Sequence, residues 1–406
     1  MTTSPPIDLA DLGARLSART EIVASELVAL RRDLHAHPEL GRRETRTTAL
    51  VTARLSAAGL SPRALPGGSG VICDIGPGGP VVALRADIDA LPIDDEKEGC
   101  PYRSTVKGVA HACGHDVHTA ILVGVGLVLA ELAREGEFTG RVRLVFQPAE
   151  ESMPGGALDV IDDGGLEEVR RIFALHCDPR QDIGTVGIRV GPITGSSDHI
   201  KVLLSSIGGH TARPHLTGDL VYALAKIISD VPAVLSRRVD PRAGLSVVWG
   251  QVHAGGAANV IPQHGEADGT VRTLDSRAWE DAEAVVTNAV ESIAEAYGVH
   301  VKVDYTRGVP PVINEIESVA IIETVARAFL GDDCVHTVEQ SLGGEDFAWY
   351  LDKVPGALFR LGVHNPANAV VRDLHQGTFD ADEDAIGVGV RLLVGAALCE
   401  LSLSRS

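Results

Sequence analysis

Short apolar runs alternate with helical patterns over much of this chain, and this alternation constrains its fold more than any other feature. Apolar residues at helical spacing predict helices over 20–32 and 45–58, the second ending at Gly59. The other apolar runs are short and bounded by Gly- and Pro-rich turns, as buried strands are: 70–75, 81–85, 142–147 and 172–175. Such alternation predicts a parallel α/β sheet covered by helices on both faces.

The pattern changes near Gly191 and returns after Arg307. Between these points, strands and helices follow in the order of a small α+β unit: 199–206, 220–235, 243–252, 265–273 and 279–297. The α/β pattern then resumes with a helix, a strand and a closing helix: 318–330, 357–363 and 387–401. The predicted organisation is an α/β domain in two pieces, 1–192 and 306–406, interrupted by an inserted α+β domain, 193–305.

Composition narrows the choice of partners and compartment. Lys and Arg number 36 against 55 Asp and Glu, which gives a formal charge of −19, and no Lys/Arg-rich run offsets it. Such a surface repels phosphate backbones and anionic lipid, so nucleic acid and membranes are disfavoured as partners. The longest apolar run, 120–130, is shorter than the ~20 residues of a membrane span and predicts a buried helix. Six cysteines without a pairing pattern, and a start without signal-peptide features, favour a reduced, cytoplasmic protein.

A dense cluster of histidine, cysteine and aspartate spans 111–118. Thiol, imidazole and carboxylate donors this close together suit zinc or another divalent transition metal. Cys113 and His115 are two residues apart, so they converge only from a loop or from the start of a helix. The alternative is that His111, His115 and His118 form one polar helix face with no metal.

Two adjacent carboxylates, Glu150 and Glu151, follow the predicted strand 142–147 and Pro148. Proline cannot donate to a sheet ladder, so the strand should end there, at the edge where open α/β sheets bind ligands. Neighbouring side chains in extended backbone point in opposite directions. One carboxylate can therefore bind a metal while the other faces a water or a substrate. The alternative is a solvated acidic turn.

Several other predicted strands end in potential ligands at the same edge of the sheet. Asp87 and Asp89 follow the strand 81–85, and His176 follows 172–175. Two further histidines belong to the last strand and the loop after it: His364 and His375. This repeated placement favours a dinuclear metal site.

The motifs in the chain resemble those of the M20 metallopeptidase/amidohydrolase family. The branch they resemble is the amidohydrolases, which includes N-acyl-amino-acid, hippurate and indoleacetyl-amino-acid hydrolases. The resemblance covers nearly the whole chain. It rests on RRDLHAHPELG (31–41), DIDALPI (87–93), HACGHDVHTA (111–120), QPAEE (147–151), GGHTARPH (208–215), NVIP (259–262), GTVR (269–272), GGEDF (343–347) and the segment 375–382.

This resemblance implies a metal-dependent α/β catalytic domain with an inserted smaller α+β lid/dimerisation domain. It implies two divalent metal ions per subunit, with five ligands of which the cysteine bridges: Cys113, His115, Glu151, His176 and His375. Glu150 matches the general base, and His210 matches a histidine that reaches the active site of a neighbouring subunit. Asn259 and Arg272 match positions assigned to substrate recognition. A homodimer formed through the inserted domain follows from the role of His210.

The activity that the resemblance implies is hydrolysis of the amide bond of a small N-acyl amino acid, with water activated by the dinuclear site. Zinc or manganese are the expected metals, and the donor set also accommodates cobalt or nickel. Three alternatives stay open. They are a metallo-carboxypeptidase or dipeptidase of the same family, a thiol amidase with Cys113 as nucleophile, and a metal-binding module without catalysis. Arg42 and Arg43 depart from the aromatic residue and acid common in this branch, which leaves the acyl preference open.

Overall fold

The computed structural model describes residues 7–403. Residues 1–6, on which the signal-peptide expectation rests, lie outside this range. The chain divides into two compact units: the first runs to Ile193 and continues over Ile313–Glu339 and from Asp346 onward, and the second comprises Thr194–Val312 and Gln340–Glu345. The predicted insertion, 193–305, ends inside the last strand of the second unit and omits the segment 340–345.

The first unit is built on an eight-stranded sheet in the order β1-β2-β4-β3-β5-β16-β6-β15. Its centre is parallel: β4 (Gly140–Gln147), β3 (Val81–Asp87), β5 (Val169–Asp182) and β16 (Gly356–His364). Every residue of β3 is buried, which is typical of a strand covered on both faces. The remaining strands of this sheet are β1 (Arg63–Ala64), β2 (Val71–Gly78), β6 (Val186–Ile188) and β15 (Val335–Thr337).

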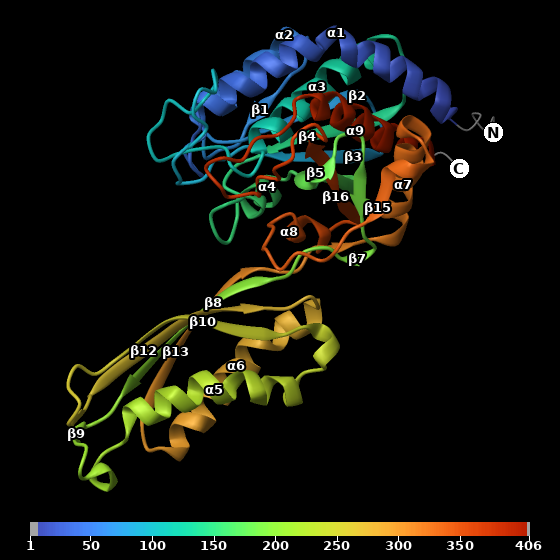
Figure 1. Cartoon of the computed structure of the whole chain (residues 1–406). Coiled ribbons are helices and arrows are strands. Elements are labelled where there is room, and N and C mark those ends of the chain that lie inside the picture. The colour runs from blue at the N-terminus through green and yellow to red at the C-terminus, as the bar shows by residue number, and fades with distance from the viewer. Residues whose placement is uncertain (1–6, 404–406) are drawn as a thin grey trace. The chain divides into compact units, whose positions relative to one another are not determined.

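Helices cover both faces of this sheet. In Figure 1, α1 (Leu9–Ala36), α2 (Thr45–Ala57), α3 (His115–Arg134) and α9 (Asp384–Leu403) lie together on one side of the strands. α4 (Ala157–Asp162) and α8 (Ala348–Leu351) lie on the other side, and α7 (Ile316–Leu330) packs on α9. α3 and α9 are long and apolar enough to cross a membrane, but 83% and 72% of their most apolar windows are buried inside the protein. The predicted buried helix at 120–130 is therefore confirmed as the core of α3.

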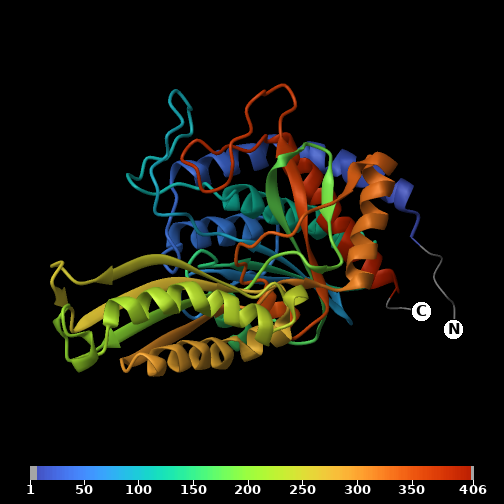
Figure 2. The same cartoon turned by 60° about the horizontal axis from the view of Figure 1, so that its bottom comes forward.

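The second unit has a four-stranded antiparallel sheet in the order β10-β12-β8-β13. Its strands are β8 (Ser197–Ser205), β10 (Ser246–Ala254), β12 (His264–Arg272) and β13 (His300–Val309). Figure 2 shows α5 (Leu220–Arg238) and α6 (Ser276–Ala296) side by side along one face of this sheet. Alternate residues of β8 are buried against these helices: Ile200, Val202 and Leu204. The predicted α/β class with an α+β insertion is confirmed.

Short elements complete both units. Four are strands in two small ladders, of which β9 (Gly209–His210) pairs with β11 (Val260–Ile261) in the second unit. β7 (Gly191–Pro192) pairs with β14 (Ile313–Asn314). Three turns of 3-10 helix lie at Pro214–Leu216, Pro241–Ala243 and Asp332–Cys334.

Several details differ from the sequence expectation. The first helix begins at Leu9 instead of residue 20, and β2 pairs with β4 antiparallel in a sheet that was predicted to be parallel. β5 continues seven residues beyond Leu175 to Asp182, so His176 lies inside this strand instead of after it. The edge strand β13 was not predicted, although its residues 300–305 alternate between polar and apolar side chains as strand residues do.

Candidate metal centre

The start of α3 carries the first two residues of the site. Gly114 precedes the helix with φ +86°, and a Cβ at this position would lie 2.9 Å from the Cys177 sulfur. A glycine is therefore required by both the backbone conformation and the packing. The turn presents Cys113 before the helix and His115 as its first residue, which is the convergence at a helix start that the sequence predicted.

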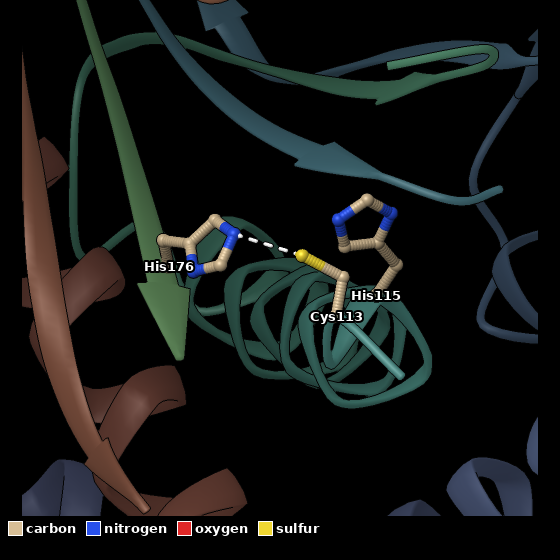
Figure 3. Close-up of side chains that lie close together, drawn as sticks. All are labelled: Cys113, His115 and His176. Atoms are coloured by element: carbon tan, nitrogen blue, oxygen red, sulfur yellow. Dashed lines mark hydrogen bonds between the residues drawn. The ribbon is translucent and has the colours of Figure 1, made fainter. Parts of the chain in front are cut away.

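Cys113 and His176 point toward each other, one from this turn and the other from β5 (Figure 3). The Cys113 sulfur lies 3.4 Å from Nε2 of His176, and Nδ1 of His176 lies 2.8 Å from the backbone oxygen of Cys177. Burial holds the pKa of His176 well below its usual value, and nearby Arg360 and His118 lower it further. The neutral ring therefore donates from Nδ1 to the carbonyl, and the lone pair on Nε2 faces the sulfur.

His115 is oriented by Asp89. Its Nδ1 lies 3.0 Å from the Asp89 backbone oxygen and 3.3 Å from a carboxylate oxygen of the same residue. Among the described residues, its buried Nε2 finds no hydrogen-bond partner. Burial disfavours the charged ring, but Asp87, Asp89 and Glu151 outweigh this effect and raise the pKa of His115 to about 10. The site thus carries an excess of negative charge that a cation would neutralise.

Glu151 and His375 close the cluster. Oε1 of Glu151 lies 3.3 Å from Nε2 of His375, and the Glu151 amide donates to Asp89 at 3.0 Å. The backbone of His375 has φ +61°, and its amide donates to Ala112 at 2.8 Å, next to Cys113. The His375 side chain is 55% exposed, whereas Cys113, His115 and His176 are all buried. The cluster therefore has one open side.

These five side chains form two overlapping groups. Potential ligand atoms of Cys113, His115 and His176 lie within 4.8 Å of one another, and so do those of Cys113, Glu151 and His375. Cys113 belongs to both groups. The donor set is one thiol, three imidazoles and one carboxylate, a mixture that borderline transition-metal ions accept. The unpaired buried Nε2 of His115 and the negative excess around it fit this assignment.

The two other residues singled out near this cluster play a supporting part. Asp87 accepts from Arg85 at 2.6 Å and lies 2.6 Å from Nδ1 of His118, whose Nε2 accepts from the Cys177 amide. Although burial opposes its charge, the neighbouring cations and histidines hold the pKa of Asp87 well below its ordinary value. With these contacts Asp87 and His118 are already engaged. Asp87 and His118 support the neighbouring ligands and add to the charge of the site. Asp89 contacts two of the ligands, His115 and Glu151.

Glu150 is not part of the two groups that share Cys113, although one of its carboxylate oxygens lies within 4.8 Å of ligand atoms of His115 and Glu151. One of its carboxylate oxygens is 4.0 Å from Nε2 of His115, and its side chain is 9% exposed. It follows Ala149, whose φ of +55° turns the chain after β4 and Pro148. The strand does end at Gln147, as the proline predicted. A buried carboxylate placed at the rim of a cationic centre can accept a proton from a water bound there.

Two histidines from the sequence analysis lie outside the cluster. Nδ1 of His364 lies 2.6 Å from Asp182, so this residue ends β16 as predicted but pairs with a different acid. His111 is buried, and within residues 7–403 neither of its ring nitrogens has a hydrogen-bond partner. Burial lowers its pKa to about 3, and it precedes α3 instead of sharing a helix face with His115 and His118.

The second unit carries the remaining predicted residues at two ends of its sheet. His210 and Asn259 are both exposed. They lie close together because His210 is opposite Val260 in the β9–β11 ladder and the backbone oxygen of Asn259 accepts from the Thr211 amide. The Ala212 amide donates to Nδ1 of His210 at 3.0 Å, so the neutral ring carries its proton on Nε2. Arg272 ends β12 at the other end of that strand, where it donates to the Leu342 carbonyl.

A parallel α/β sheet, a thiol shared by two ligand groups and a separate carboxylate beside them define the class of dinuclear metallohydrolases. Comparison with known proteins agrees with this class. Residues 83–398 match the model of peptidase family M20/M25/M40. The chain belongs to this family.

Two relatives and one solved structure illustrate the relationship. The chain is 48% identical over 382 residues to a Rhodococcus jostii protein named "Putative glutamate–cysteine ligase 2-3", covering 94% of this chain but only 47% of that protein. It is 37% identical over 381 residues to N-acetylcysteine deacetylase of Bacillus subtilis, covering 93% and 97% of the two chains. The crystal structure of the Bacillus subtilis YXEP protein, a dinuclear metal-binding peptidase of family M20, matches with a TM-score of 0.81. It is 34% identical and covers 94% of this chain and 99% of its own.

Proposed function

We propose that this enzyme hydrolyses the amide bond of a small N-acyl amino acid, with Glu150 as general base beside two divalent cations. The observation that carries the proposal is the sharing of Cys113 by two ligand groups with Glu150 next to them. Cys113, His115 and His176 would hold one cation, and Cys113, Glu151 and His375 the other. Bound there, the cations supply Lewis acidity toward a water and the scissile carbonyl.

The residues of the chain then divide the remaining work. Glu150 takes the proton of the attacking water and returns it to the departing amine, because its carboxylate lies at the rim of the cluster. Asp89 keeps His115 and Glu151 in place through the contacts described above. The thiolate, imidazole and carboxylate donors favour Zn²⁺ or Mn²⁺ in this role.

A thiol amidase with Cys113 as nucleophile is a weaker alternative, despite the contact between Cys113 and His176. Burial raises the pKa of the Cys113 thiol well above its usual value, and Glu151, Glu150 and Asp87 raise it further. A nucleophilic cysteine needs the opposite shift. With a cation bound instead, the thiolate becomes a ligand and its charge is compensated.

The expected substrate carries a thiol. One relative is named an N-acetylcysteine deacetylase. Another is named a putative glutamate–cysteine ligase, and this chain matches about half of that relative's length. Both names concern cysteine with a substituted or newly acylated amine. We therefore expect N-acylated cysteine to be the preferred class. The six cysteines of the chain are free thiols, which suits the cytoplasm, where such compounds stay reduced.

His210 is expected to act across a homodimer formed through the second unit. The two-stranded ladder of β9 and β11, which carries His210, adjoins the start of β12, whereas Arg272 ends this strand eight residues later, roughly 26 Å away at 3.3 Å per residue. One small N-acyl amino acid cannot span that distance. If Arg272 holds the carboxylate of the substrate, the His210 that donates to its carbonyl oxygen belongs to another copy of the chain.

The decisive experiment measures amine release from a panel of N-acyl amino acids by Zn²⁺- or Mn²⁺-loaded protein. The panel pairs acetyl-cysteine with acetyl-serine and acetyl-alanine, and adds γ-glutamyl-cysteine, benzoyl and indoleacetyl conjugates and two dipeptides. Hydrolysis that a chelator abolishes and that favours cysteine over serine supports the proposal. Cleavage of dipeptides alone would assign a dipeptidase. Activity that resists chelators and is lost to iodoacetamide would assign the thiol amidase.

A further inference from the structure

The segment 37–44 contains a buried acid that neither metal binding nor proton transfer explains. Glu44 directly precedes α2 and is completely buried. It makes no capping hydrogen bond to its own helix. Instead, Oε1 of Glu44 accepts from the backbone amide of Ala149 at 2.7 Å, across 105 residues of sequence.

Ala149 is the residue that sets the direction of Glu150. Its φ of +55° lies in the left-handed region, which is unfavourable for a residue with a Cβ. The conformation persists only because the surroundings hold it. The Gly156 amide donates to the Ala149 carbonyl at 3.1 Å, and the Glu44 carboxylate holds the Ala149 amide from the other side.

The neighbouring segment is packed closely around the same turn. A Cβ at Gly41 would lie 3.1 Å from Cα of Ala149 and 3.2 Å from Oδ2 of Asp89. The same Asp89 oxygen accepts from the Glu151 amide. Glu151 therefore has an anchor of its own, and Glu44 holds the residue directly before Glu150.

We propose that Glu44 is a positioning residue for catalysis: its hydrogen bond to the Ala149 amide holds the left-handed turn that aims Glu150 at the substrate water. This inference rests on the proposed role of Glu150 as general base. Without the Glu44 acceptor, Ala149 relaxes toward negative φ and the Glu150 carboxylate turns away. Glu151 stays anchored by Asp89, so both cations remain bound.

The test compares four variants in the metal-loaded, full-length enzyme. Glu44→Met keeps the volume of the side chain but removes the acceptor, whereas Glu44→Gln keeps an acceptor oxygen. Thr47→Val is the matched control, since Thr47 is buried in the same helix. Glu44→Met combined with Ala149→Gly tests rescue, because glycine adopts positive φ without strain.

Three quantities are measured: kcat and KM, metal content, and amide hydrogen exchange in the peptide that covers 147–156. Glu44→Met should lower kcat on the order of 10–100-fold with KM and metal content unchanged, because small misplacements of a catalytic group cost this much. It should also speed exchange in this peptide. Glu44→Gln and Thr47→Val should match the wild type, and Ala149→Gly should restore part of the lost kcat. Should Glu44→Met fail to fold, Glu44→Asp withdraws the acceptor by one methylene and is expected to shift kcat and exchange in the same direction.

Several results would overturn the inference. Unchanged exchange and kcat in Glu44→Met would show that the turn holds itself. An equal loss in Thr47→Val would assign the effect to the stability of α2, and an equal loss in Glu44→Gln would assign it to charge. Failure of the proposed function looks different: Glu150→Gln would stay active, while exchange in the Glu44 variants would still report whether the turn depends on Glu44.

Discussion

The two units keep their functional side chains in opposite environments. In the first unit, Cys113, His115 and His176 are buried and contact one another or their supporting residues. In the second, His210 and Asn259 are exposed at the small ladder of β9 and β11, and their contacts are with backbone groups of that ladder and the turn after β9. A buried cluster is ordered by its own unit before any ligand binds. Exposed residues such as these can act only when a substrate or a second copy of the chain binds to them.

The largest expected effect follows from removing the residue that the two ligand groups share. Cys113→Ala should lower metal content from two ions per chain and remove nearly all turnover, since both groups lose a ligand. Cys177→Ala is the matched control: this cysteine is equally buried and lies next to His176, but its sulfur faces the Gly114 carbonyl at 3.9 Å. Metal analysis and chelator-sensitive melting measure the outcome. Two tightly bound ions in Cys113→Ala would refute the role of this residue as a ligand that both groups share.

The next effect separates binding from chemistry inside the buried cluster. Glu150→Gln should retain both cations but lose roughly 10²–10⁴-fold in kcat, the usual contribution of a general base. Glu168→Gln, an exposed glutamate of the same unit, should leave kcat unchanged. Metal content and single-turnover rates are measured on the same samples. A near-normal rate with two ions bound would remove Glu150 from the proton transfer.

Much of the buried cluster could be predicted from the sequence because its residues follow local rules. Polar residues at the ends of β3, β4 and β16 and at the start of a helix mark one edge of the sheet, and the structure brings Cys113, His115, Glu151, His176 and His375 together there. Residue types and spacing alone did not divide them into ligands and supports, and only the resemblance to the M20 family supplied the five ligands. Asp87 and His118 have the residue types of ligands, but contacts with Arg85 and the Cys177 amide engage them.

Long-range contacts explain the other misses. His364 ends its strand as predicted, yet a partner on the extended part of β5 takes it out of the cluster. The contact between Glu44 and Ala149 joins residues 105 apart, and no local pattern marks it. In the second unit, the sequence assigned Asn259 and Arg272 together to substrate recognition, while the strand β12 separates these two residues. Only the register of the sheet reveals that separation.

The exposed ladder of β9 and β11 supplies the next test. His210→Ala should lower kcat about 10²–10³-fold, the cost of losing one donor to the oxyanion. His215→Ala, another exposed histidine of the same turn, is the control. Mixing inactive His210→Ala with inactive Glu150→Gln should restore activity, because one mixed site has both residues intact. Mixed dimers without any activity would mean that His210 acts in the site of its own subunit or has no catalytic role. The second unit would then not need a second copy of the chain for catalysis.

The smallest effect concerns Arg272, which is neither fully buried like the ligands of the first unit nor fully exposed like His210. It is half-buried and donates to the Leu342 carbonyl, so part of its guanidinium is already held while its other donors can bind a carboxylate. Arg272→Ala should raise KM roughly 10–150-fold, since a charged hydrogen bond contributes roughly 1.5–3 kcal/mol, and kcat should stay within the range of the wild type. Arg242→Ala, an exposed arginine of the same unit, should change neither constant. The discriminating substrate is the amidated analogue, which lacks the free carboxylate. If Arg272→Ala raises KM equally for acid and amide, the residue holds its own unit together through Leu342. If KM rises only for the acid, Arg272 binds the substrate carboxylate. The second unit would then contain one functional residue whose position its own unit sets before the substrate binds, through the contact with Leu342.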